Sequence, residues 1–160
     1  MLGMGKEMAA RFAGVHIDRI LTVEISGIAP ALMTGLALDV PVVYARKIKP
    51  ITMAGPVFLE TAPSHTKGSE VNLLVSAEFL PPNQDVLIID DFLATGKTLM
   101  ALARMVTSAQ SQIVGVGIVV EKTFEGGRDL MHAAGYHMPI ESLATIVNMD
   151  DGKIVFADDV

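Results

Sequence analysis

Long apolar runs alternate with helical patterns along this chain, and that alternation constrains the fold more than any other feature. Residues 19–25, 40–45, 86–89 and 113–120 are rich in Val, Ile and Leu, as strands buried on both faces are. Helical patterns cover 4–13, 28–38, 97–109 and 128–134, and shorter strands are expected at 71–77, 140–147 and 153–156. The order predicts an α/β fold with a mainly parallel sheet and helices on both faces.

One long connection interrupts this order. Residues 48–70 mix Gly, Pro, Ser, Thr and Lys without a clear period. A connection of that length in a compact domain is usually a functional lid or a disordered segment. We therefore expect a long flexible loop at about 48–70 inside a single domain that covers residues 1–160.

Polar residues follow four of the predicted strands, at 24–27, 46–47, 90–98 and 121–122. In parallel sheets ligands bind beyond the carboxyl ends of the strands, so these clusters are expected to form one composite site. The segment VLIIDDFLATGKT at 86–98 is the most informative, because it places two carboxylates beside a short turn that opens a helix.

The turn at 94–98 has the features of a phosphate cradle. Amides at a helix start have no partner in the helix, and the helix dipole adds partial positive charge there. Gly96 permits close approach, and Thr95 and Thr98 can donate hydroxyl hydrogen bonds. Thr95 could equally be an ordinary N-cap.

Two motifs that resemble nucleotide-binding loops are rejected. The nucleoside-triphosphate loop GxxxxGK[ST] would need its first glycine at the position of Asp91. Gly115 and Gly117 lie inside a predicted strand rather than after it, so we interpret them as close packing against a helix.

Asp90 and Asp91 could accept hydrogen bonds from vicinal hydroxyls, or hold Mg²⁺ directly or through water. The alternative is a solvated pair that closes a strand. The apolar run before the pair and the turn after it favour a functional role, so the expected ligand is a sugar that carries both a phosphate and hydroxyls.

Residues after two other strands could form a second anion site. The hydroxyl of Ser26 and the amides around Gly27 can donate hydrogen bonds, Arg46 can pair with phosphate oxygens, and Lys47 can act as a point charge. Each signal is weak alone. Together they predict two anion sites that flank an acidic, hydroxyl-binding centre; His65, in the long loop, is a weaker candidate for phosphate contact.

Composition excludes several other classes of protein. The 160 residues are 51% hydrophobic and 19% charged, with net charge −6, which indicates a globular protein and not a general nucleic-acid binder. There is no cysteine, which excludes disulfides, zinc–thiolate sites and cysteine nucleophiles. No apolar run approaches the roughly 20 residues that span a bilayer, and the start lacks the pattern of a signal peptide. A cytoplasmic protein without membrane partners is expected.

The run IIDDFLATGKT resembles the 5-phosphoribosyl 1-diphosphate (PRPP) signature of type I phosphoribosyltransferases: a hydrophobic run, two acids, two apolar residues, then [AD]-T-G-[GK]-T. The resemblance covers nearly the whole chain and is closest to bacterial members that act on xanthine, through SGIAPALMTGLALDVPVVYARK, GIVVEKTFEGGRDL and ESLATI. It implies a pentosyltransferase of purine salvage that joins a purine nitrogen to the ribosyl carbon and releases pyrophosphate. It also implies Mg²⁺ as cofactor and a homodimer.

The resemblance assigns roles to the matching positions. The 5′-phosphate of PRPP would be cradled by Ala94, Thr95, Gly96, Lys97 and Thr98. The ribose hydroxyls and Mg²⁺ would be held by the catalytic acids Asp90 and Asp91. The pyrophosphate would be held by Ser26, Gly27, Arg46 and Lys47. The loop at 48–70 would close over the reaction, and residues 122–160 would form part of a hood over the purine.

Two positions bear on which purine is used. Ala94 stands where hypoxanthine–guanine members usually carry an acid, as in adenine and xanthine members. Lys122 then favours xanthine, because an ammonium group donates hydrogen bonds and suits the exocyclic oxygen of a 6-oxopurine. Lys122 could otherwise be a solvated lysine at a strand end, and Phe124 could face either the base or the core.

The chain departs from its relatives in two places. They carry a further segment before the first helix, which forms part of the hood, so a small, reduced hood is expected here. The segment TAPSHTKG also lacks the aromatic residue that relatives often carry in the loop. The missing segment makes a non-catalytic regulator that binds PRPP or a nucleotide an alternative to the xanthine enzyme. An adenine enzyme is another alternative, because adenine members resemble this chain through Glu121 and Gly127-Arg128.

Overall fold

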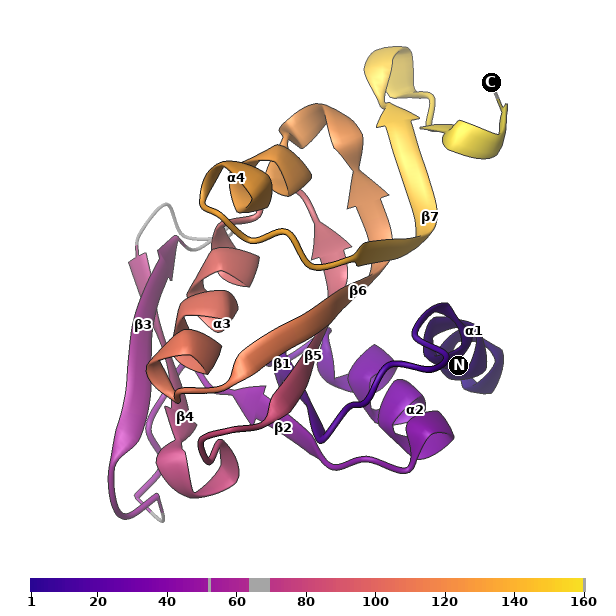
Figure 1. Cartoon of the computed structure of the whole chain (residues 1–160). Coiled ribbons are helices and arrows are strands. Elements are labelled where there is room, and N and C mark those ends of the chain that lie inside the picture. Colours follow the sequence, from indigo (N-terminus) through magenta and orange to yellow (C-terminus); the bar gives the residue numbers. More distant parts are fainter. Residues whose placement is uncertain (52, 64–69, 160) are drawn as a thin grey trace.

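Six strands form the main sheet, in the order β2-β1-β5-β6-β7-β8 (Figure 1). The computed structural model describes residues 1–51, 53–63 and 70–159. The strands are β1 (Arg19–Val23), β2 (Val42–Ala45), β5 (Asp85–Leu93), β6 (Gln112–Lys122), β7 (Ile140–Asn148) and β8 (Val155–Phe156). Neighbouring strands from β2 to β7 are parallel, and β8 is antiparallel to β7. The prediction of a mainly parallel sheet is confirmed.

Helices cover both faces of this sheet, as predicted. One face carries α1 (Leu2–Arg11) and α2 (Ile28–Leu38), and the other carries α3 (Lys97–Ser108) and α4 (Gly127–Ala133) (Figure 1). Leu87 and Ile89 of β5 pack in the core of the first face, whereas Val86 and Ile88 pack in the core of the second. Successive strand residues point to opposite faces, so a continuous apolar strand serves both cores.

The two glycines of β6 lie beneath α1. A Cβ atom on Gly115 would overlap the ring of Phe12, and one on Gly117 would lie 2.5 Å from the sulfur of Met8. These close approaches confirm the interpretation of the pair as packing against a helix.

In the described part of the chain, no helix has the length and hydrophobicity needed to cross a bilayer.

A second, two-stranded sheet replaces part of the expected loop. β3 (Val57–Pro63) pairs with β4 (Glu70–Ser76) in the antiparallel direction, and Arg46, just after β2, bridges to Leu74 of β4. The prediction of an irregular loop over 48–70 is therefore wrong for 57–63. Apolar and polar residues do not alternate between a buried and an exposed face there, because apolar Leu59 is 56% exposed. The pattern therefore does not predict a strand. Residues 52 and 64–69, which include His65, lie outside the described residues.

β5 and β6 also run further than predicted. Asp90 and Asp91 lie inside β5, where Asp90 is paired with Ile118, and Leu93 further along is paired with Glu121 of β6. A ladder of backbone hydrogen bonds tolerates polar side chains wherever the neighbouring strand continues, so polarity alone did not mark the strand ends. Asp90, Asp91, Glu121 and Lys122 thus belong to the last residues of their strands, whereas residues 24–27, 46–47 and 94–98 follow the strand ends.

Candidate active site

A cleft of about 430 Å³ opens at the carboxyl ends of β1, β5 and β6. Its lining includes residues from all four predicted clusters, namely Glu24, Ser26, Lys47, Asp90, Asp91, Ala94, Thr95, Gly96, Thr98 and Lys122. Of the residues to which the resemblance assigned a role, three do not line it: Gly27, Arg46 and Lys97. The structure therefore brings most of the predicted composite site together, as the rule for parallel sheets anticipates.

The loop at 94–98 keeps donors free for a ligand. Gly96 has φ +77 and precedes α3, whose first hydrogen bond runs from the Met100 N–H to the Gly96 carbonyl, 2.9 Å. The amides just before Met100 thus open the helix without an acceptor inside it. Thr95 Oγ1 is buried and has no hydrogen-bond partner among the described residues. Such a set of donors at a helix start suits an anion.

The start of α4 supports this loop from behind. A Cβ atom on Gly96 would lie 2.8 Å from the carbonyl oxygen of Gly127, and one on Gly127 would overlap the carbonyl oxygen of Ala94. Backbone therefore packs directly on backbone, which explains the glycine at 127. No role is predicted for Gly127 from the sequence.

The two aspartates have different environments. Asp90 is only 6% exposed, and its Oδ1 accepts a hydrogen bond from the Asp91 N–H, 2.9 Å. Burial, and then the neighbouring carboxyl group of Asp91, raises the pKa of Asp90 well above its usual value. Asp91 is partly exposed and faces the cleft. A simple solvated pair does not describe this arrangement, because one member is desolvated.

A buried threonine lies beside Asp90. Thr22 of β1 is fully buried, and its Oγ1 has no hydrogen-bond partner among the described residues. A Cβ atom on Gly27 would lie 2.5 Å from that Oγ1 and 2.7 Å from Asp90 Oδ1. Gly27 therefore covers the two polar groups without lining the cleft. The sequence signal for Thr22 was a single hydroxyl within an apolar strand.

The basic pair after β2 is divided between two environments. Lys47 lines the cleft, and its amide donates to Glu24 Oε1, 2.7 Å. The Arg46 guanidinium lies 3.8 Å from Glu24 Oε2 and 5.8 Å from the ring centre of Tyr44. Glu24 thus contacts both residues near the end of β1, and of the two basic residues only Lys47 lines the cleft.

Lys122 has two neighbours at the cleft. Its Nζ lies 3.5 Å from Glu125 Oε1 and 5.7 Å from the ring centre of Phe92, and all three residues line the cleft. The pair offers a hydrogen-bond donor next to an acceptor, beside an aromatic ring. Phe124 is 51% exposed and is not part of the lining.

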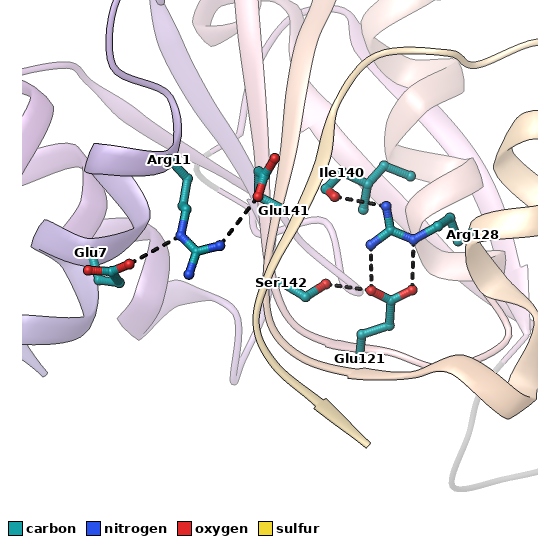
Figure 2. Close-up of polar contacts among 7 residues, drawn as sticks. All are labelled: Glu7, Arg11, Glu121, Arg128, Ile140, Glu141 and Ser142. Atoms are coloured by element: carbon teal, nitrogen blue, oxygen red, sulfur yellow. Dashed lines mark hydrogen bonds and ion pairs between the residues drawn. The ribbon is translucent and has the colours of Figure 1, made fainter. Parts of the chain in front are cut away.

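A polar cluster lies behind the cleft, and Glu121 is its one member that belongs to a predicted polar cluster, 121–122. Arg128 of α4 donates through Nε to Glu121 Oε1, 2.9 Å, and through Nη2 to Oε2, 2.5 Å (Figure 2). Ser142 Oγ donates to the same Oε2, 2.6 Å. Burial raises the pKa of Glu121, but the hydrogen bonds from Arg128 and Ser142 outweigh it and lower the pKa overall.

Carboxylates in the cleft could contribute to a metal site only together with a ligand. Among the described residues, one group of three metal-binding side chains is present, His16, Asp18 and Asp85, and it lies at the opposite ends of β1 and β5. In the cleft Asp90 and Asp91 supply carboxylates beside the anion loop. Mg²⁺ is typically held by one or two carboxylates together with substrate phosphates, so this donor set fits a metal that arrives with a phosphorylated ligand.

Known proteins share this fold and sequence. The phosphoribosyl transferase domain family matches residues 6–150. Xanthine phosphoribosyltransferase of Deinococcus deserti is 48% identical over 149 residues, which are 93% of this chain and 76% of that protein. Xanthine phosphoribosyltransferase of Latilactobacillus sakei subsp. sakei is 46% identical over 159 residues, which are 99% of this chain and 80% of that protein.

Solved structures agree with these matches. Adenine phosphoribosyltransferase from Thermoanaerobacter pseudethanolicus has TM-score 0.76 and 26% identity, and the match covers 90% of this chain and 80% of that one. The family match spans most of the chain, and the two relatives are far above the identity at which family membership is in question. This chain belongs to the phosphoribosyltransferase family and has its type I fold.

Proposed function

We propose that this protein transfers the 5-phosphoribosyl group of PRPP to xanthine, giving XMP and pyrophosphate in purine salvage. The observation that carries the proposal is the position of Lys122 in the same cleft as the anion loop 94–98. An ammonium group can donate to the exocyclic oxygen of a 6-oxopurine but cannot accept from the amino group of adenine. Relatives at 46–48% identity that are named xanthine phosphoribosyltransferase support the same base.

The cleft residues divide into three proposed contacts. The donors of Ala94, Thr95, Gly96, Lys97 and Thr98 hold the 5′-phosphate. The ribose hydroxyls are held by Asp90 and Asp91. The pyrophosphate is held by Ser26, Gly27, Arg46 and Lys47, of which Ser26 and Lys47 line the cleft directly. In the reaction a purine nitrogen bonds to the anomeric carbon as the carbon–oxygen bond to pyrophosphate breaks, so placed charges and exclusion of water supply the catalysis.

Mg²⁺ enters this proposal with PRPP. When bound, it neutralises charge on the leaving pyrophosphate and orients it. Asp90 and Asp91 are the carboxylates that would hold it, and the positive charge of the ion would oppose the effect of burial, which raises the pKa of Asp90.

A homodimer is the proposed assembly. Apolar side chains are exposed on α2 and the edge strand β2, among them Leu32, Leu36 and Tyr44. Leu32 and Leu36 also line a second hollow with Pro41 and Val42. An exposed apolar patch next to a sheet edge suits burial against a second copy. Light scattering behind size-exclusion chromatography measures the mass directly, and a monomer at micromolar concentration would contradict this assembly.

Pyrophosphate release tests the proposed reaction. The protein, PRPP and Mg²⁺ are mixed with xanthine, hypoxanthine, guanine or adenine in parallel, and pyrophosphate is measured with time. The proposal expects the fastest release with xanthine. The fastest release with adenine would instead identify an adenine enzyme, which the similarity to solved adenine phosphoribosyltransferases makes the first alternative. Binding of PRPP without release with any purine would identify a non-catalytic regulator.

A further inference from the structure

Arg128 joins three elements behind the cleft without lining it. Its fork binds both oxygens of Glu121 at the end of β6, and its Nη1 donates to the carbonyl of Ile140 at the start of β7, 2.8 Å (Figure 2). Ser142 of β7 completes the hydrogen bonding of Glu121. The Glu121 side chain is 4% exposed, so water does not offer it an alternative partner. One cluster of side chains therefore fixes α4, β6 and β7 together.

The Glu121 end of the cluster adjoins the residues proposed to face the base. Glu121 is followed by Lys122, and successive strand residues point to opposite faces, so Lys122 lines the cleft while Glu121 points into the packing. Thr123–Glu125 form a short 3₁₀ turn that carries Glu125 into the cleft. The orientation of Glu121 thus sets the position of Lys122 and of the turn behind it.

The Arg128 end adjoins the anion loop. Arg128 is preceded by Gly127, on which a Cβ atom would overlap the Ala94 carbonyl oxygen and would lie 2.9 Å from the Gly96 amide nitrogen. Any shift of the first turn of α4 therefore moves the backbone against which the loop packs. The ion pair joins the two ends of the segment 121–128. One end adjoins Lys122 of the cleft lining, and the other packs against the anion loop.

From this geometry we infer that Arg128 is a positioning residue that holds the anion loop and Lys122 at a fixed separation. The inference rests on the proposed function, because it assigns PRPP to one half of the cleft and the purine to the other. Arg128 does not line the cleft, so it acts through Gly127 and Glu121. A guanidinium is required because its planar fork bonds both carboxylate oxygens and leaves a third donor for Ile140, whereas a lysine ammonium is a single point charge.

The test compares variants of this cluster with a matched ion pair elsewhere on β7. Arg128→Lys keeps the charge but loses the fork, and Ser142→Ala removes one hydrogen bond. The control is Arg11→Gln, which breaks the more exposed contacts of Arg11 with Glu7 and Glu141 (Figure 2). For each protein the melting temperature, the KM for PRPP, the KM for xanthine, kcat, and the Kd of PRPP with Mg²⁺ by calorimetry are measured.

The inference expects Arg128→Lys to raise both KM values and the PRPP Kd on the order of 10-fold to 100-fold, the loss expected for a site displaced by about 1 Å. Ser142→Ala should change them in the same direction by less, and Arg11→Gln should leave them unchanged. If Arg128→Lys lowers the melting temperature but leaves both KM values and the Kd at wild-type levels, the residue is only structural and the inference is wrong. If Arg128→Lys does not fold, Ser142→Ala decides instead: wild-type KM values and a wild-type PRPP Kd for that variant would overturn the inference.

Failure of the proposed function would give a different result. A wild-type chain that binds PRPP but uses no purine would overturn the proposed reaction, while the PRPP Kd of the variants would still decide the role of Arg128. A wild-type chain that does not bind PRPP would overturn both.

Discussion

Gly27 lies against the carboxyl group of Asp90, at a distance that leaves no room for a side chain. A Cβ atom there would lie 2.7 Å from Asp90 Oδ1, 2.5 Å from Thr22 Oγ1 and 3.1 Å from the Val23 carbonyl oxygen. The loop after β1 and the acidic end of β5 are thus in direct contact, although they are far apart in the sequence.

Gly27→Ala should therefore lower the free energy of unfolding by about 1–3 kcal/mol, the usual cost of an overpacked site. It should also weaken PRPP binding, because Asp90 and the proposed pyrophosphate loop must separate to admit the methyl group. Urea unfolding and calorimetry measure the two effects. Gly3→Ala is the matched control, since a Cβ atom on Gly3 of α1 meets nothing within 4 Å. Equal stability of the two variants would contradict the close contact.

Asp90 should make the stability of the protein depend on pH with a defined sign. Its folded pKa is raised above the unfolded value of about 3.9, so the stabilisation is complete below pH ~4 and is lost as the pH rises through the folded pKa. Asp90→Asn removes this dependence, and its stability relative to wild type should increase from pH 4 towards pH 8. Urea unfolding at several pH values measures the difference.

Asp18 supplies a control of opposite sign. A hydrogen bond from the Asp85 amide lowers the pKa of Asp18, so its contribution to stability is present above the unfolded pKa and is lost as the pH falls through the folded one. Asp18→Asn should therefore destabilise the protein near neutral pH and approach wild type in acid. If the stability of Asp90→Asn and of Asp18→Asn, each relative to wild type, changed with pH in the same direction, the assigned environments would be wrong.

Thr95 should contribute to ligand binding more than to folding. Its buried hydroxyl has no partner among the described residues, so Thr95→Val removes an unsatisfied group and should leave the free energy of unfolding equal or slightly higher. The PRPP Kd should rise roughly 10-fold to 100-fold, because hydrogen bonds to charged groups contribute about 1.5–3 kcal/mol. Thr107→Val, in α3, is the control, because that hydroxyl donates to the Ala103 carbonyl. An unchanged PRPP Kd for Thr95→Val would remove this residue from the proposed site.

Lys122→Ala should reduce kcat/KM for xanthine by roughly 10-fold to 100-fold, the effect of losing a charged hydrogen-bond donor. The KM for PRPP should change much less, since Lys122 is assigned to the purine and is not among the proposed phosphate contacts. Lys6→Ala, at an exposed position of α1, controls for loss of one positive charge. A drop of equal size with adenine as substrate would mean that Lys122 does not read the 6-oxygen.

Sequence periodicity predicted the main sheet well, because its central strands are buried on both faces and therefore apolar throughout. It failed for β3, where Leu59 is exposed and the partner strand β4 lies across a connection. The pairing of these strands is a tertiary property that composition does not encode. The ends of β5 were misjudged for a related reason, because the backbone partner of Asp90 belongs to β6.

The candidate site was predictable where its residues follow strands, and less so where they act through packing. Lys47 and Lys122 were found by their positions at strand ends. Thr22 and Gly127 contribute through close contacts that appear only once β1, β5 and α4 are placed together. The pairing of Glu121 with Arg128 and Ser142 likewise depends on how β6 and β7 align, which the sequence of either strand alone does not specify.

The cleft collects residues from Val23 to Glu125, and its walls meet only when β1, β5 and β6 are aligned. An unfolded or partly folded chain therefore cannot bind the ligand. The stability of the folded protein then increases with the ligand concentration. A ligand present at 100 times its Kd adds about 2.7 kcal/mol to the apparent stability. A low concentration of PRPP would then stop turnover and also increase the unfolded fraction of the protein, which is the fraction exposed to proteolysis.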